Sequence, residues 1–145
     1  MFGRRLRWIW PALLAAAPLV LGCSGGDPFR YVKVSGKVTY EDGSFIPAER
    51  ITLTFVPQAQ GIDAKTQPHT GTAEVNVADG SFDAVTSHRF GDGLVAGRHK
   101  VLVTALGEHE MPSNAVPADY GDLGRTPLEV DTSESPFALQ VRKPN

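Results

Sequence analysis

The sequence predicts an all-β protein: a single antiparallel, seven-stranded Greek-key β-sandwich that follows a cleaved N-terminal signal. Short segments alternate apolar and polar residues with a period of two, which is the pattern of strands with one face in a core. The 145 residues include 15 glycines and 11 prolines, which indicates many turns. No segment shows the 3.6-residue period of an amphipathic helix, and short strands separated by turn signals are typical of a sandwich.

The first two strands are expected over residues 33–40 and 50–56. In each, apolar side chains occupy alternate positions: Val34, Val38 and Tyr40 in the first, and Ile51, Leu53 and Phe55 in the second. Gly36 stands at an apolar position of the first strand, where a missing side chain lets a backbone or an aromatic ring approach closely. The dipeptide Asp42-Gly43 then ends that strand.

Three more strands are expected over residues 72–77, 81–86 and 98–106. The dipeptide Asp79-Gly80 separates the first two of these, and such a pair between alternating runs predicts a hairpin, since both turn positions favour positive φ. The third contains three consecutive apolar residues, which indicates a central strand covered on both faces. Polar, glycine-containing loops surround these strands at 58–70 and 87–96.

The chain ends with strands expected over residues 126–130 and 136–141. The longest irregular stretch, residues 107–124, precedes them. Long loops of this kind are either functional or packed against the body. Its apolar side chains therefore form a binding edge or pack back onto the sandwich: Met111, Val116 and Tyr120.

Residues 1–22 are expected to be a lipoprotein signal peptide. Three arginines precede an uncharged apolar segment that ends in V-L-G-C at Val20 to Cys23. This resembles the bacterial lipobox, which implies cleavage before Cys23, a diacylglycerol on its sulfur, and an acyl chain such as palmitate on the new amino group. Several acyl chains anchor a protein firmly to a membrane. Residues 23–31 are then the lipidated cysteine and a flexible spacer, and residues 32–145 the single domain.

The cysteine count and the charge exclude several classes of function. Cys23 is the only cysteine, so an internal disulfide and a thiolate metal cluster are both excluded. The chain has 14 basic and 16 acidic residues, and loss of the signal removes three arginines and no acid, which leaves a net charge of −5. A mildly acidic body without a basic patch argues against binding nucleic acid and against electrostatic docking on anionic lipid.

Three motifs resemble the carboxypeptidase regulatory-like and transthyretin-like β-sandwich domains, which have an immunoglobulin-like architecture. They are V-S-G-K-V-T-Y-E-D-G at Val34 to Gly43, A-D-G-S-F-D at Ala78 to Asp83, and G-L-V-A-G-R-H-K-V-L-V at Gly93 to Val103. The chain departs from the family pattern where Ala96 replaces a proline and His99 a tyrosine. Small bacterial lipoproteins of this kind carry V-P-x-x-Y, here at Val116 to Tyr120, which favours packing of that stretch. The motifs are structural, so the resemblance implies a fold and not an activity.

No catalytic, cofactor or metal site is expected. The four histidines show neither the i, i+2 nor the i, i+4 spacing of ligand pairs, and His99 is expected to be structural: His69, His88, His99 and His109. Acidic residues in loops are interpreted as turn residues, not as calcium ligands: Asp42, Asp79, Asp92, Asp119 and Asp122. Two enzymes of similar fold are disfavoured, because the chain lacks the H-x-H pair of intradiol dioxygenases and the Y-R-G-S end of hydroxyisourate hydrolases.

These observations predict a non-enzymatic lipoprotein of the bacterial cell envelope, facing the periplasm or the cell surface. It is expected to act as a protein-interaction or adaptor module, held to the membrane by the lipid on Cys23, with an envelope protein or a glycan as partner. One alternative is a carrier of a glycan or small ligand, which an exposed aromatic platform would favour. The other is an enzyme of unknown type, which a carboxylate–histidine pair in a cleft would favour.

Overall fold

The computed structural model describes residues 26–145, so the expected signal peptide and Cys23 lie outside the described residues. This part of the chain is all-β, with nine strands and three short 3₁₀ helices. The strands are β1 (Tyr31–Val32), β2 (Gly36–Tyr40), β3 (Arg50–Pro57), β4 (Gly71–Val75), β5 (Ser81–Phe82), β6 (Leu94–Val95), β7 (Arg98–Leu106), β8 (Glu129–Asp131) and β9 (Phe137–Val141). The 3₁₀ helices are η1 (Glu108–Glu110), η2 (Ala118–Gly121) and η3 (Thr132–Glu134).

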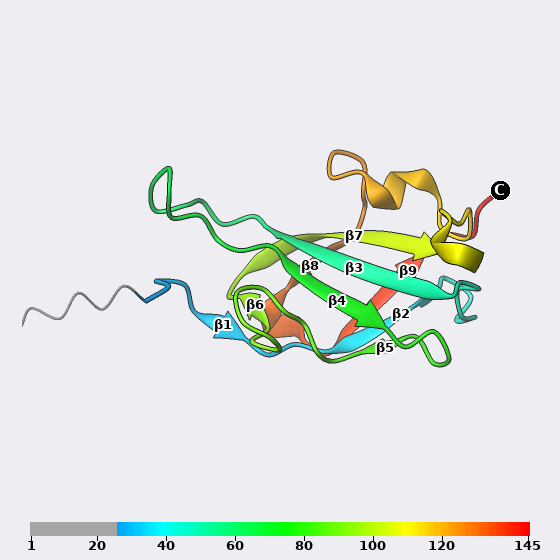
Figure 1. The fold of residues 1–145 in the computed structure, drawn as a ribbon, viewed down its shortest axis with the longest axis horizontal. Helices are drawn as coiled ribbons and strands as arrows, with labels where there is room; N and C mark the ends of the chain where they lie inside the picture. Colours follow the sequence, from blue (N-terminus) through cyan, green and yellow to red (C-terminus); the bar gives the residue numbers. More distant parts are fainter. Residues whose placement is uncertain (1–25) are drawn as a thin grey trace, which may run out of the picture.

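The strands form three open sheets (Figure 1). One has the order β5-β2-β9, the second has the order β4-β3-β7-β8, and β1 pairs with β6 in a two-stranded ribbon. As expected for the apolar run in strand 98–106, β7 is an inner strand of its sheet. The expected all-antiparallel pairing is wrong for β2 and β9, which run parallel. A parallel pair requires a crossover connection, and here the chain reaches β9 from β8, which belongs to the other large sheet.

Alternating side chains from both large sheets form one buried cluster, as the period-two patterns predicted. Three aromatic rings join the sheets at its centre. The ring centroid of Phe55 on β3 lies 5.9 Å from that of Phe82 on β5 and 6.3 Å from that of Phe137 on β9. All three side chains are at most 5% exposed, so this cluster fixes how the two sheets pack.

The strand expected over residues 33–40 is shorter in the structure: β2 begins at Gly36, residues 33–35 belong to no strand, and β1 lies before them. Val32 pairs with β6, whereas Gly36 pairs with both β5 and β9, so the chain passes from one sheet to another between these residues. The backbone N–H of Ser35 donates to the hydroxyl of Ser135 at 3.1 Å at this crossing point. The two short strands β1 and β6, which the sequence did not predict, raise the number of strands above seven.

The hairpin expected at Asp79-Gly80 is only partly present. The chain reverses there, but β5 pairs with β2, and its neighbour β4 belongs to the other sheet. Gly80 has a φ of 75°, whereas Asp79 is not among the residues with positive φ, so the two-residue hairpin turn is wrong. The turn is hydrogen-bonded to β2 instead, because the N–H of Val38 donates to the carbonyl of Gly80 at 2.9 Å.

The stretch 107–124 packs back onto the sheets through two tyrosines. The Tyr120 side chain is 1% exposed, and its hydroxyl accepts a hydrogen bond from the backbone N–H of Arg142 at 2.9 Å. The hydroxyl of Tyr40 on β2 donates to the carbonyl of Ala115 at 2.6 Å. The packing prediction is thus confirmed for Tyr120 and for the buried Val116, and it is wrong for Met111, which is 63% exposed.

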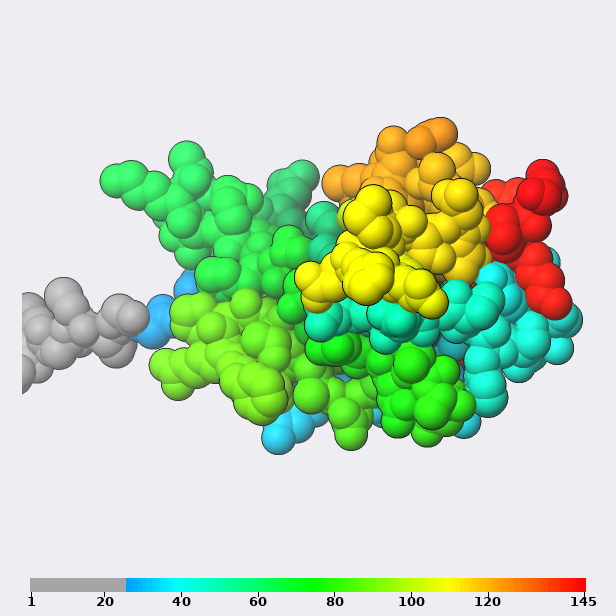
Figure 2. All heavy atoms as spheres, turned by 45° about the vertical axis from the view of Figure 1, so that its right-hand side comes forward, coloured from blue at the N-terminus to red at the C-terminus, as the bar shows by residue number. Residues whose placement is uncertain are grey.

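Two long loops lie at the end of the molecule where the described chain begins. Loop 58–70 and loop 87–93 both lie beside the segment that leads into β1 (Figures 1 and 2). This end is therefore built from three segments that are far apart in the sequence. Within residues 26–145, we find no helix of the length and apolar character needed to cross a membrane.

Candidate functional site

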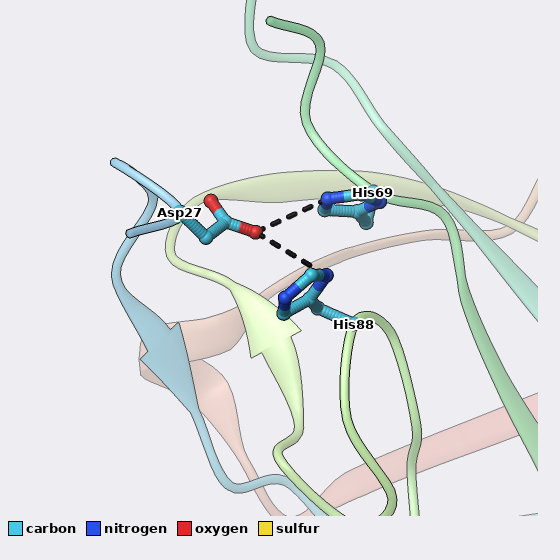
Figure 3. Close-up of side chains that lie close together, drawn as sticks. All are labelled: Asp27, His69 and His88. Atoms are coloured by element: carbon cyan, nitrogen blue, oxygen red, sulfur yellow. Dashed lines mark ion pairs between the residues drawn. The ribbon is translucent and has the colours of Figure 1, made fainter. Parts of the chain in front are cut away.

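A carboxylate and two imidazoles meet at this end of the molecule (Figure 3). Asp27 comes from the segment before β1, His69 from loop 58–70 and His88 from loop 87–93. Asp27 Oδ2 lies 3.1 Å from His69 Nε2 and 3.7 Å from His88 Nδ1. One potential ligand atom of each residue lies within 4.8 Å of the other two, so the three side chains converge on one point.

The Asp27 carboxylate is held by hydrogen bonds from its own segment. Its Oδ2 accepts a hydrogen bond from the hydroxyl of Tyr31, and its Oδ1 accepts one from the backbone N–H of Phe29 at 3.0 Å. These two bonds, that of Tyr31 first, lower the pKa of Asp27 below its ordinary value, because they favour the charged form. Burial, and then the neighbouring carboxylate, raise the pKa of Tyr31. At neutral pH the site therefore holds an anionic carboxylate beside a neutral phenol.

Loop 87–93 is shaped around the carboxylate of Asp92. This carboxylate accepts the backbone N–H groups of Ser87, His88 and Arg89 at 2.9, 3.1 and 2.8 Å. Burial opposes its ionisation, but the three donors outweigh burial and lower the pKa of Asp92. The ring of Tyr31 stacks on that of His88 with centroids 6.3 Å apart and planes inclined by 21°. His88 is thus held on its backbone side and on one face of its ring.

The three side chains border a cavity of about 260 Å³ that is open to solvent. The side chain of Asp27 is 12% exposed, whereas those of His69 and His88 are 44% and 39% exposed. Lys65 and Thr66 of loop 58–70 also line this cavity. An ion or small molecule from solution can therefore reach the ring nitrogens without any movement of the sheets.

Two kinds of chemistry are open to this arrangement. Two imidazole nitrogens and one carboxylate oxygen are a common ligand set for divalent transition metals, with room for a water molecule. A histidine paired with a carboxylate is also the arrangement of a general base. The sequence alone did not predict that these residues meet, because they lie in separate segments with no ligand spacing along the chain.

The other two histidines lie elsewhere. His99 on β7 is 1% exposed, and its Nδ1 lies 3.2 Å from the carbonyl oxygen of Gly97. Its Nε2 is buried without a partner among the described residues, and burial lowers the pKa of the ring, so His99 is a neutral residue of the interior. His109 is an exposed residue of η1 with a φ of 55°.

Four of the five acidic residues that were expected in turns make local hydrogen bonds. Carboxylates accept the backbone N–H two residues further along at three turns: Asp42 from Ser44, Asp79 from Ser81, and Asp122 from Gly124. Asp119 instead forms ion pairs with Arg125 at 3.0 Å and Arg142 at 3.6 Å. These contacts agree with the structural interpretation of the acids.

Comparison of the chain with protein-family models, with curated proteins and with solved structures finds no match in any of the three. The resemblance of the motifs to transthyretin-like domains therefore stays a prediction.

Proposed function

We propose that the chain is a lipid-anchored, non-enzymatic module of the bacterial cell envelope that binds a protein partner. In this proposal the domain is a seven-stranded Greek-key sandwich of the transthyretin-like kind. The two large sheets, with three and four strands, support this assignment, and the ribbon of β1 and β6 is an addition to it. The lipobox motif at Cys23 supports the anchor.

The observation that carries the binding role is a groove of about 680 Å³ where edge strands of the two large sheets meet. Gly36, Phe82 and Phe137 line it together with the charged side chains Lys37, Glu74 and Asp83. A groove with an apolar lining and a few charged groups is suited to hold an extended peptide, whose side chains can enter the groove.

Most of the outer edge of β4 is paired with the chain's own segment 81–86, and Glu74 leaves one gap in this pairing. Thr72 exchanges backbone hydrogen bonds with Thr86, and the N–H of Asn76 donates to the carbonyl of Ser81 at 2.8 Å. Between them, Glu74 directs its backbone to the same side, because alternate residues of a strand do so. Within the described residues, Glu74 makes no backbone hydrogen bond on that side. A polar group of a partner protein that enters the groove can supply this one hydrogen bond.

The anchor sets which end of the domain faces the membrane. Cys23 precedes Asp27 by only four residues, a reach of about 14 Å in a fully extended chain. Loops 58–70 and 87–93 lie at that end, and they carry Ile62 and Phe90, whose exposed fractions are 64% and 91%. These two side chains are placed to enter the apolar boundary of the bilayer, while the groove between the sheets stays open to a partner.

The glycan carrier is less well supported. Sugar binding commonly uses an exposed aromatic face, and the aromatic residues that line the groove, Phe82 and Phe137, are only 3% and 5% exposed. One observation favours the enzyme alternative: Asp27 and His69 form a carboxylate–histidine pair at a cavity. However, His69 is 44% exposed, so water screens the pair and weakens the case for catalysis.

We expect one reproducible protein partner after chemical crosslinking of the tagged full-length chain in intact envelopes. Ala138→Arg, an exposed position that lines the groove, should abolish its recovery, because the long charged side chain enters the peptide path. Thr104→Arg, exposed on β7 and outside the groove lining, is the matched control and should recover the partner as the wild type does. Equal recovery with both variants would exclude the groove, and recovery of sugar without protein would support the carrier.

Lipidation of Cys23 has its own test. Wild-type chain should incorporate labelled palmitate, and its intact mass should correspond to a mature N-terminus at Cys23 with acyl chains attached. Cys23→Ser should lose the label completely, because no other cysteine is present to accept the diacylglycerol. Ser24→Ala should keep both label and mass. A free thiol at Cys23 in wild-type protein would contradict the anchor.

A further inference from the structure

We propose that Asp27, His69 and His88 bind a divalent transition-metal ion, which links the segment before β1 to loops 58–70 and 87–93. The proposed adaptor function does not require this site, since the groove is lined by other residues. The two proposals can therefore fail separately.

The ligand set selects the class of metal. Imidazole nitrogens suit Zn²⁺, Fe²⁺, Co²⁺, Ni²⁺ and Cu²⁺, whereas Mg²⁺ and Ca²⁺ prefer sites made of oxygen atoms. Only one of the three side chains offers oxygen, and its partners offer one ring nitrogen each. We therefore expect binding of Zn²⁺ and Co²⁺ and none of Mg²⁺ or Ca²⁺ at the same concentration.

The distances fit a tetrahedral ion with three protein ligands. With metal–ligand bonds of about 2.0–2.1 Å, neighbouring ligand atoms lie about 3.3 Å apart. The carboxylate oxygen of Asp27 is 3.1 Å from His69 Nε2 and 3.7 Å from His88 Nδ1, which are close to this value. The two histidine nitrogens lie within 4.8 Å of each other. A small rotation of the exposed histidine side chains brings them to the separation that a tetrahedral ion requires. A fourth position then faces the cavity, where water can bind.

A hydrogen-bonded cluster without metal explains only part of this geometry. The 3.1 Å distance between Asp27 and His69 is that of an ordinary hydrogen bond. His88 Nδ1, at 3.7 Å, is too far to make one, although Asp92 and the ring of Tyr31 hold His88 toward the carboxylate. The ring of His88 also packs against that of His69, with centroids 4.8 Å apart, and a metal ion at the point of convergence would give the ring nitrogen of His88 a ligand bond as well.

Groups behind the ligands are in place as well. The hydroxyl of Tyr31 and the N–H of Phe29 fix the orientation of the Asp27 carboxylate, as hydrogen-bond donors behind the ligands usually do at metal sites. One group opposes the ion, because the cationic Lys65 borders the same cavity. Removal of that charge should therefore tighten metal binding.

The test is titration of the full-length lipidated protein in detergent, after removal of metal with a chelator. We expect one Zn²⁺ per chain by calorimetry and visible d–d absorption on addition of Co²⁺. His69→Ala, His88→Ala and Asp27→Asn should each weaken binding at least about 10-fold. Tyr31→Phe should weaken it about 10-fold, since loss of a group that hydrogen-bonds to a ligand typically costs about 10–100-fold in metal affinity. Zn²⁺ should raise the unfolding temperature of the wild type more than that of His69→Ala at the same concentration.

Two control variants make the result specific. His109→Asn removes an exposed histidine outside the cluster and keeps a residue that tolerates positive φ, so it should bind as the wild type does. Lys65→Ala should bind at least as tightly as the wild type. Absence of Zn²⁺ binding by the wild type, or equal binding by a His69→Ala/His88→Ala double variant that melts cooperatively, would overturn the proposal.

Discussion

Replacement of Tyr120 by alanine is expected to lower the free energy of unfolding by about 3–5 kcal/mol, the cost typical of deleting a large buried aromatic side chain. The ring is 1% exposed, so its removal leaves a cavity between η2 and the sheets. The variant also loses the hydrogen bond that the Tyr120 hydroxyl accepts from Arg142. Urea denaturation followed by fluorescence or circular dichroism measures the change. Because domains are stable by only about 5–15 kcal/mol, this loss is a large fraction of the total.

Two further variants separate the contributions at this position. Tyr120→Phe keeps the ring and should cost only about 1 kcal/mol, the net value of one hydrogen bond. Met111→Ala alters an exposed side chain of the same stretch and should change the free energy of unfolding by less than about 0.5 kcal/mol. A loss below about 1 kcal/mol in Tyr120→Ala would show that stretch 107–124 does not depend on this anchor.

Alternation along the chain predicted which side chains face the core. Ile51, Leu53 and Phe55 on β3 and Leu139 on β9 are all at most 5% exposed, as the period of two required. The V-P-x-x-Y motif likewise located the buried Tyr120. The predictions for the strands succeeded because successive residues of a strand point to opposite faces, so the pattern along the chain is enough to identify the buried face.

Strand pairing was harder to predict, because it depends on contacts between distant residues. Alternation in residues 81–86 does not show that β5 leaves β4 and joins β2, where Val38 binds the carbonyl of Gly80. The parallel pairing of β2 and β9 is equally invisible locally, since it results from a crossing between sheets. A period of two predicts which residues of a strand face the core, but it does not predict which strands pair with that strand.

The candidate metal centre could not be predicted for the same reason. His69 and His88 lie in separate loops, and Asp27 lies in a segment that composition assigned to a flexible spacer. Ligand spacing is informative where two ligands share one helix or strand, and here each ligand comes from a different segment. Only the fold brings loops 58–70 and 87–93 to the start of β1.

Replacement of Gly36 by alanine is expected to lower the free energy of unfolding by about 3 kcal/mol, the upper part of the range for overpacking. A Cβ at this position would overlap the carbonyl oxygen of Phe137 and lie 2.9 Å from its nitrogen. It would also lie 2.8 Å from Cζ of the Phe82 ring. The sequence predicted such a close approach, and the structure shows that both a backbone and a ring make it.

The neighbours of Gly36 cannot move aside cheaply. Phe137 is held in the parallel ladder, where its N–H donates to the carbonyl of Ser35 at 2.8 Å, and the Phe82 ring packs against Phe55. Gly121→Ala is the matched control, because a Cβ there meets nothing within 4 Å, and it should change stability by less than about 0.5 kcal/mol. Equal stability of Gly36→Ala and Gly121→Ala in urea would show that β2 and β9 are not as closely paired as described. A loss of stability in Gly36→Ala alone would show that Gly36, which lines the proposed groove, is also needed for the packing of the core.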